Sequence, residues 1–364
     1  MKHRLKKVLM VLVAVWMVVP LFVPAAAADG TQHSLNRYFQ EAATEYEVPV
    51  EVLMAVGYAE SRWNDHQGKP SQSNGYGIMH LVDNPEQQTL QAASRLTGIS
   101  ENELKIDIKQ NIRGAAAVLA DIAKEQNDGQ LPQELGQWYT VVAEYAGYKN
   151  DYVTKIYADE VFRLIEEGVQ RKVDGETLVI HPTTVHPEKG AYQDVEIPII
   201  GGKADAPFVR WAPAHSSNFT EANREADGNN IDTVVIHTTQ GSYSGAISWF
   251  QNPSANVSAH YVIRSSDGEI TQSVSTKNIA WHAGNWSYNV RSIGIEHEGY
   301  VDQPGWYTDA MYRASANLTR YLCDTFAIPR NRDRIIGHNE VPGATHTDPG
   351  PLWDWNRYMT LVNQ

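Results

Sequence analysis

The sequence contains a single cysteine, Cys323, among 364 residues. One cysteine excludes a disulfide within the chain, so stability must come from packing, with or without the help of a bound metal. Cys323 falls in the stretch LTRYLCDTF, whose apolar residues recur at helical spacing. We therefore expect it to be a core residue and not a nucleophile.

Basic residues are also scarce: 30 Lys and Arg face 43 Asp and Glu, which gives a net charge of −13. Such an acidic chain is a poor nucleic-acid binder, and bulk charge would not draw it to anionic polymers. The sequence also lacks an H-E-x-x-H stretch, the signature of many zinc peptidases. We expect no nucleic-acid partner and a monomeric protein.

Only the N-terminus carries a long apolar run. Met1–Lys7 is basic, Val8–Pro24 is almost wholly apolar, and Ala25–Ala28 resembles a small-residue cleavage site. This order predicts a signal peptide over residues 1–28 and a secreted protein. The alternative is an uncleaved anchor, which would be the chain's one contact with a membrane. No cysteine follows the run, which argues against a bacterial lipoprotein.

Residues 29–168 have the pattern of an all-α domain. Apolar residues recur at helical spacing in six stretches, and the sequence Ser-Glu-Asn-Glu at 100–103 has the form of a capping box. The predicted helices are Leu35–Tyr46, Val50–Trp63, Thr89–Leu96, Ile108–Glu125, Glu134–Tyr145 and Asp151–Glu167.

Residues 169–207 are rich in proline and lack helical periodicity, so we interpret them as a linker with some extended structure. Residues 208–364 alternate short β-branched runs with helical patterns, which predicts an α/β domain with a mixed sheet. The predicted strands are Asp232–Thr239, Ser258–Ser265, Glu269–Val274, Ser292–Glu298 and Arg334–Gly337, and the predicted helices are Ser244–Phe250, Thr308–Phe326 and Trp353–Val362.

Several side chains able to bind a metal follow the predicted strands. DTVVIHTT ends in His237, and IIGHNEVPGATHTDPGP carries His338, His346 and Asp348 in the loop after another strand. Two imidazoles and one carboxylate suit zinc, and a catalytic site leaves the fourth position to water. The alternative is that these are unrelated surface or core histidines.

The stretch SIGIEHEGY places Glu296 and Glu298 on one face of an apolar strand, with His297 on the other. A carboxylate there is costly unless it is paired or has a chemical role. Glu296 is our candidate general base for a water activated by the metal. The alternative is that both glutamates orient histidine ligands, a role we favour for Glu298.

The ordered set DTVVIHTT, SAHYVI, DGEI, WHAG, SIGIEHEG, GHNEVPG and HTDPGP resembles the zinc-dependent N-acetylmuramoyl-L-alanine amidases, relatives of the peptidoglycan recognition proteins. The resemblance covers about residues 208–355. It implies Zn²⁺ held by His237, His338 and Asp348, with Glu296 as the catalytic glutamate. The family often has an oxyanion-stabilising lysine where this chain has His346, so that role for His346 is an open prediction.

The resemblance also implies that His260 and His282 line or support the cleft. A structural role is the alternative for His260, and His282 with its neighbour Trp281 is a candidate substrate contact. Trp286 and Tyr288 are further aromatic residues in this region that could stack on sugar faces or pack locally.

In the helical region, YAESRWN followed by SQSNGYGIMHL resembles the soluble lytic transglycosylases of the lysozyme superfamily. Glu60 corresponds to their catalytic acid, and apolar neighbours would desolvate it and raise its pKa. The family has a glutamine where this chain has His80. The alternative is that Glu60 pairs with Arg62 or a helix end in a domain that only binds glycan.

Together these patterns predict a secreted peptidoglycan hydrolase of the cell wall, with a lysozyme-like domain and a zinc amidase domain. A Gram-positive envelope is our expectation and a periplasmic location the alternative. The competing function is a non-catalytic peptidoglycan-recognition protein, although such relatives typically lack a zinc ligand. A general metallopeptidase is a third reading, without a sequence signature of its own.

Overall fold

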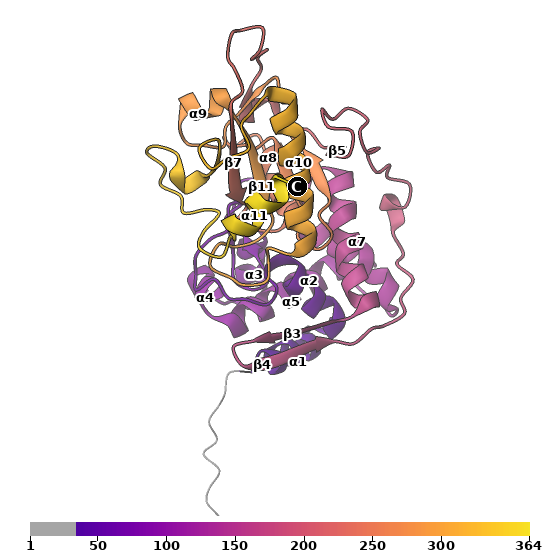
Figure 1. The fold of residues 1–364 in the computed structure, drawn as a ribbon. Helices are drawn as coiled ribbons and strands as arrows, with labels where there is room; N and C mark the ends of the chain where they lie inside the picture. Colours follow the sequence, from indigo (N-terminus) through magenta and orange to yellow (C-terminus); the bar gives the residue numbers. More distant parts are fainter. Residues whose placement is uncertain (1–33) are drawn as a thin grey trace, which may run out of the picture. The chain divides into compact units, whose positions relative to one another are not determined.

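The computed structural model describes residues 34–364, and the predicted signal peptide lies outside them. Within the described residues, no helix has the length and apolar character needed to cross a membrane. Residues 34–364 form one compact unit. We call residues 34–168 the helical half and residues 208–364 the sheet half, and both are seen in Figure 1.

The helical half contains seven α-helices among the residues described, in agreement with the predicted all-α class. Side-chain oxygens begin several of them: Ser34, Ser100, Asp107 and Asn150 each accept a hydrogen bond from a backbone N–H of the first turn. The helices are α1 (Leu35–Tyr46), α2 (Val50–Ser61), α3 (Thr89–Thr97), α4 (Glu101–Ile106), α5 (Ile108–Gln126), α6 (Tyr139–Ala146) and α7 (Asp151–Glu167), with the short strands β1 (Gly75–Tyr76) and β2 (Leu81–Val82) between α2 and α3.

The segment between the halves is partly folded. Strands β3 (Val169–Val173) and β4 (Glu176–Ile180) form an antiparallel hairpin whose apolar side joins the core of the helical half. Further along, the Lys155 ammonium group of α7 donates to the backbone carbonyls of Tyr192, Gln193 and Val195 at 2.7, 3.1 and 3.2 Å. The expected extended structure is present, and these contacts fasten the segment to the helical half.

The sheet half is built on six strands in the order β12-β7-β11-β8-β9-β5. The β12-β7, β7-β11 and β11-β8 pairs are parallel, and β8-β9 is antiparallel, which confirms the mixed sheet. The strands are β5 (Arg210–Trp211), β7 (Thr233–Thr238), β8 (Tyr261–Ile263), β9 (Ile270–Gln272), β11 (Ser292–His297) and β12 (Ile335–Gly337); β6 (Phe219–Thr220) and β10 (Ile279–Ala280) form a separate pair.

Alternation along the strands separates the two faces of this sheet. Val234 and Ile236 of β7 point to the face that packs against α10 (Asp309–Phe326) and α11 (Trp355–Val362). Val235 and His237 therefore point to the opposite face, where Val235 packs with Ala283 and Ile336. Helix α8 (Tyr243–Gln251) packs against β8, and α9 (Trp286–Arg291) precedes β11.

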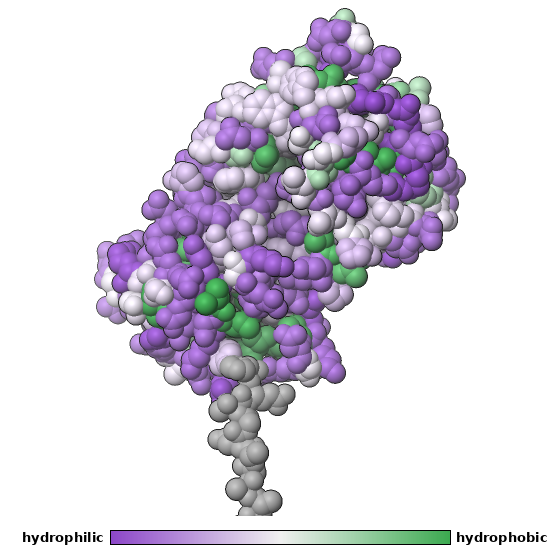
Figure 2. Space-filling view, turned by 90° about the vertical axis from the view of Figure 1, so that its left-hand side faces the viewer, coloured by the Kyte–Doolittle hydropathy of each residue, from purple (hydrophilic) through white to green (hydrophobic). Residues whose placement is uncertain are grey.

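A hydrophobic cluster joins the two halves. Tyr152, Val153 and Ile156 of α7 pack in one cluster with Ile247 and Phe250 of α8. The face of the molecule shown in Figure 2 is otherwise mostly hydrophilic, with small and separate apolar patches. The domain limits at residues 28, 168 and 207 remain predictions.

Candidate metal centre and neighbouring residues

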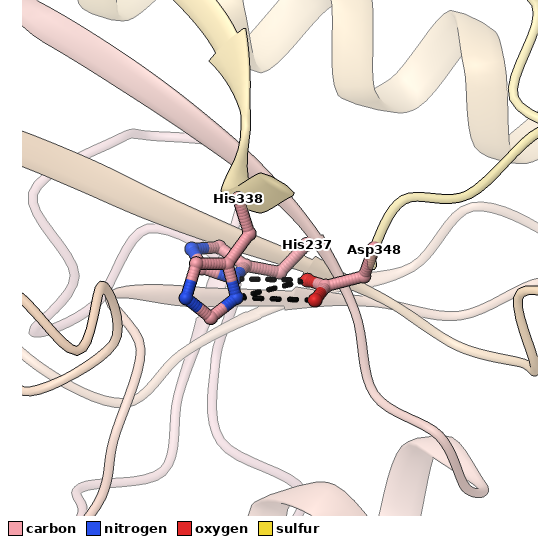
Figure 3. A group of neighbouring side chains, drawn as sticks. All are labelled: His237, His338 and Asp348. Carbon is pink, nitrogen blue, oxygen red and sulfur yellow. Dashed lines mark hydrogen bonds and ion pairs between the residues drawn. The ribbon is translucent and has the colours of Figure 1, made fainter. Parts of the chain in front are cut away.

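Three side chains from distant parts of the chain meet at the carboxyl ends of two parallel strands. His237 lies near the end of β7, and His338 directly follows β12. Because Gly337 pairs with Ile236 in parallel register, the next residue on each strand is a histidine, and the two rings lie side by side with centroids 4.5 Å apart. Asp348 reaches the same point from the loop that follows (Figure 3).

The donor atoms of these residues are spaced as the ligands of one ion. The Asp348 carboxylate lies 3.2 Å from Nδ1 of His237 and 3.1 Å from Nδ1 of His338, and one ligand atom from each residue falls within 4.8 Å of the others. Ligands about 2.0–2.1 Å from a tetrahedral zinc ion would be about 3.3–3.4 Å apart. The predicted ligand set therefore fits zinc.

The protonation of the group also suits a cation. Burial lowers the pKa of His237 to about 4, so its imidazole is neutral at pH 7 and able to act as a ligand. Burial alone would raise the pKa of Asp348, but its contacts with His237 and His338 outweigh that effect and hold the pKa below its usual value. Asp348 is therefore a carboxylate.

A chain of hydrogen bonds behind His237 sets which of its nitrogens carries the proton. The Ser292 hydroxyl donates to the carbonyl of Tyr288 and accepts from Nε2 of His282 at 3.2 Å. Nδ1 of His282 then accepts from Nε2–H of His237 at 2.9 Å. This leaves Nδ1 of His237 unprotonated, and it is this atom that faces Asp348.

Glu296 stands beside the group because it pairs with His237 across β11 and β7. Its side chain is buried, and Oε2 has no hydrogen-bond partner among the described residues. Burial, and secondarily the Asp348 carboxylate, raises the pKa of Glu296 well above its ordinary value. A buried carboxyl with a free oxygen next to a metal site has the features of a proton acceptor.

The two residues after Glu296 have other surroundings. His297 points to the opposite face, where Nδ1 lies 2.8 Å from the carbonyl of His237 and Nε2 lies 2.7 Å from the hydroxyl of Ser315. Glu298 accepts from the backbone N–H groups of Tyr243 and Ser265 at 3.0 and 2.7 Å. Glu298 therefore fixes the start of α8 and the loop after β8.

The remaining predicted site residues take different positions. His346 is exposed, and its ring stacks on that of His338 with centroids 4.7 Å apart. Trp281 is half-buried and donates to Thr220 at 3.0 Å.

His260 has no exposed surface, and its Nδ1 accepts a hydrogen bond from the Gly294 N–H of β11 at 3.1 Å. This contact supports β11. A direct contact of His260 with substrate stays a prediction that this geometry does not support. His282 is likewise buried behind His237.

Two supporting residues were missed by the sequence analysis. Asn289 accepts from the backbone of His282 and Ala283 at 3.2 and 2.8 Å and so fixes the loop before α9. Arg224 is fully buried and donates to the carbonyls of Thr276 and Ser292 at 2.9 and 2.8 Å. Neither residue lies in a motif, so only the fold shows its role.

In the helical half, Glu60 is buried at the end of α2, as its apolar neighbours predicted. Burial raises the pKa of its carboxyl to about 7. Its Oε2 lies 3.5 Å from Nδ1 of His80, whose Nε2 lies 2.7 Å from the hydroxyl of Ser71. The alternative pairing with Arg62 is not seen, because that guanidinium binds Ser265 and the carbonyl of Gly305.

Comparison with known proteins finds two families. Residues 227–351 match the N-acetylmuramoyl-L-alanine amidase family, and residues 37–158 match the transglycosylase SLT domain. N-acetylmuramoyl-L-alanine amidase A of Achromobacter lyticus is 43% identical over 170 residues, which are 42% of this chain and 92% of that protein. The 1,6-anhydro-N-acetylmuramyl-L-alanine amidase AmpD of Escherichia coli (strain K12) is 44% identical over 114 residues, 30% of this chain and 60% of that protein.

A crystal structure of a selenomethionine derivative of AmpD is 31% identical and covers 46% of this chain and 99% of its own, with a TM-score of 0.36. The two histidines and the aspartate form a group that could hold a metal ion, with the buried carboxyl of Glu296 beside it. The sequence matches identify the family: the chain belongs to the N-acetylmuramoyl-L-alanine amidase family, and its helical half carries a lysozyme-like transglycosylase domain.

Proposed function

We propose that this protein hydrolyses the amide bond between N-acetylmuramic acid and L-alanine in peptidoglycan, with Zn²⁺ held by His237, His338 and Asp348. The observation that carries this proposal is the convergence of these three ligands within 4.8 Å, directly beside the buried carboxyl of Glu296. When bound, zinc would polarise the amide carbonyl and lower the pKa of a water to about 7. No residue of the chain needs to become covalently modified.

The protein's own residues supply the proton movements and the charge. Glu296 takes a proton from the attacking water and passes it to the amine of L-alanine as the C–N bond breaks. His346, exposed above His338, is placed to stabilise negative charge on the carbonyl oxygen when its imidazole is protonated. His282 and Ser292 keep Nδ1 of His237 unprotonated throughout.

The test uses Glu296→Gln, which keeps the shape of the side chain but cannot accept the proton. We expect zinc content to stay at one ion per chain, and release of free L-alanine amino termini from purified peptidoglycan to fall by about 10²–10⁴-fold. Full turnover in this variant would remove Glu296 from the mechanism. Stoichiometric zinc without turnover in the wild type would instead favour a peptidoglycan-recognition protein.

We also propose that the helical half cleaves glycan strands through Glu60, which its transglycosylase match and its raised pKa support. The protonated Glu60 would give its proton to the glycosidic oxygen as the bond from C1 breaks. The C6 hydroxyl of the same sugar then attacks C1 and returns its proton to Glu60, which forms a 1,6-anhydro ring without water. One carboxyl suffices for this internal reaction, unlike simple glycoside hydrolysis.

Export to the cell wall completes the proposal. This part of the proposal rests on the proposed substrate and on the sequence of Met1–Pro24, in which basic residues precede a long apolar run. The chain would contact a membrane only if this signal peptide remained uncleaved. N-terminal sequencing of the protein recovered outside producing cells tests it: a start at or near Asp29 is expected. A chain retained in the cytoplasm with Met1 intact would contradict export.

A further inference from the structure

The carboxyl of Glu60 is enclosed from two sides. In the helical half it faces His80, and in the sheet half the hydroxyl of Ser242 donates to its Oε2 at 3.2 Å. Only 3% of Glu60 is exposed. A group that must deliver a proton to a glycosidic oxygen has no open route to one in this arrangement.

Ser242 is held firmly at this position because it begins α8. Its hydroxyl also accepts from the backbone N–H of Gly245, and the first residues of α8 follow directly after it. The hydroxyl of Ser244, in the first turn of α8, lies 3.5 Å from the hydroxyl of Tyr148 in the helical half. The start of α8 therefore covers the Glu60 side of the helical half.

A second set of contacts joins the two halves through residues that follow Glu60 in the sequence. Arg62 donates to Ser265 at 2.8 Å and to the carbonyl of Gly305, and its guanidinium lies 4.0 Å from the ring centre of Trp306. Nearby, the ring of His66 stacks on Tyr300 with centroids 4.0 Å apart. These contacts bring the loop after β11 against the end of α2.

Neither of two cavities at the junction is lined by Glu60: one lies beside His80, and the other, of about 450 Å³, is lined by residues that include Arg62 and Glu298. The cavity beside His80, whose lining also includes Tyr148 and Trp249, has a volume of about 30 Å³. That volume accommodates about one water molecule, whereas pockets for small organic ligands measure roughly 300–1,000 Å³. A glycan strand can reach Glu60 only if the two halves move apart.

We propose that the sheet half closes the Glu60 site, so that glycan cleavage is held off until α8 and the loop after β11 separate from the helical half. This inference rests on the proposed glycan cleavage for its consequence, but access to Glu60 can be measured without it. While the halves are closed, only the proposed amide-cleaving site of the sheet half would be active, and the Glu60 site would not.

The experiment uses the full chain with a wedge at the contact, Ser244→Trp, and Ser244→Ala as the matched control. Retained amide hydrolysis shows that the sheet half is folded. A second opening variant, Arg171→Ala with Gln303→Ala, removes the hydrogen bonds to Pro304 and His66 at the edge of the contact. For one assay, each of these variants also carries Glu60→Cys and Cys323→Ala, and the rate at which a maleimide labels the thiol at position 60 is measured. For the other assay, each variant keeps Glu60, and the release of 1,6-anhydro sugars is measured.

We expect the thiol introduced by Glu60→Cys to label at least tenfold faster in an opening variant than in the otherwise unmodified or Ser244→Ala chain. With native Glu60, anhydro-sugar release should rise in parallel, and it should vanish with Glu60→Gln. Rapid labelling in the chain without an opening substitution, or no change in either opening variant, would overturn the closure. Faster labelling without any anhydro sugar would uphold the closure and refute glycan cleavage. Anhydro-sugar release from the unmodified chain at the rate of the opened chain would refute the closure and uphold glycan cleavage.

Discussion

His282 lies behind His237, with Nδ1 of the former 2.9 Å from Nε2 of the latter. The acceptor for the outer N–H of this proposed metal ligand is therefore a buried imidazole, and not a carboxylate or a backbone carbonyl. Burial lowers the pKa of His282 well below its usual value, so His282 remains neutral and can accept this hydrogen bond. Its own orientation depends on Ser292 at 3.2 Å.

Ser292→Ala is therefore expected to weaken zinc binding without touching a ligand. Without the hydroxyl, His282 no longer has a fixed tautomer and competes with His237 for the proton between them. Loss of a partner behind a metal ligand typically costs about 10–100-fold in metal affinity. A chelator competition assay measures the zinc dissociation constant, and Ser287→Ala on the exposed side of α9 is the control. An unchanged constant in Ser292→Ala would contradict the hydrogen-bond chain.

Arg224→Lys tests the hydrogen bonds that hold the segments around Thr276 and Ser292. The guanidinium joins segments around Thr276 and Ser292, and its planar set of donors matches several carbonyls at once. A lysine keeps the charge but leaves part of these buried carbonyls unpaired, at about 1–3 kcal/mol for each group. We expect the free energy of unfolding to fall by at least that amount in a urea titration. Stability equal to that of the wild type would show that the carbonyls find other partners.

His346→Ala is expected to lower kcat for amide hydrolysis by about 10²–10³-fold, the usual effect of removing one group that stabilises an oxyanion. Zinc content should not change, because His346 contacts the site by stacking on His338 and is not one of the three ligands. His346→Lys should retain activity, since a lysine carries the positive charge that this role requires. His215→Ala, an exposed histidine outside the site, is the control. Loss of zinc in His346→Ala would instead indicate a ligand.

Glu60 should make the stability of the protein depend on pH. Burial raises the pKa of Glu60 from 4.5 to about 7, so between these values the folded chain holds a proton that the unfolded chain has released. This contribution is present below pH 4.5 and is lost as pH rises through 7, on the order of 2 kcal/mol between pH 5 and pH 8.

Glu60→Gln removes the titrating group, so its stability relative to the wild type should increase from pH 5 to pH 8. Urea unfolding at both pH values measures the difference, and Glu125→Gln on an exposed part of α5 is the control. A difference between wild type and Glu60→Gln that does not vary with pH would contradict the raised pKa.

The fold was largely predictable because its elements carry strong local patterns. Helices α1 and α7 have the predicted bounds, and the Ser100 hydroxyl accepts from Glu103 N–H as its capping pattern predicts. Strand β8 is shorter than expected and begins at Tyr261. Before it, Ser258 and His260 make hydrogen bonds outside the regular β8 ladder, with Trp281, Gly294 and Ser273 as their partners. Helix α9 was missed, since its six residues carry no clear period.

The candidate site was predictable only in part. Two of the three proposed metal ligands, His237 and His338, lie at the ends of strands whose apolar residues are visible in the sequence, and parallel register brings them together. The enclosure of Glu60 was not predictable, because Ser242 lies 182 residues away and has no distinguishing neighbours. Such a contact depends on how two folded halves pack, which local patterns do not encode.

The most direct test of the central claim is an anomalous difference map, recorded at the zinc absorption edge, from crystals of the zinc-loaded protein. The account predicts one strong peak within about 2.0–2.2 Å of a nitrogen of His237, a nitrogen of His338 and a carboxylate oxygen of Asp348, with Glu296 beside it but not bound. A peak that excludes any of these three ligands, or a map without a peak at this site, would contradict it.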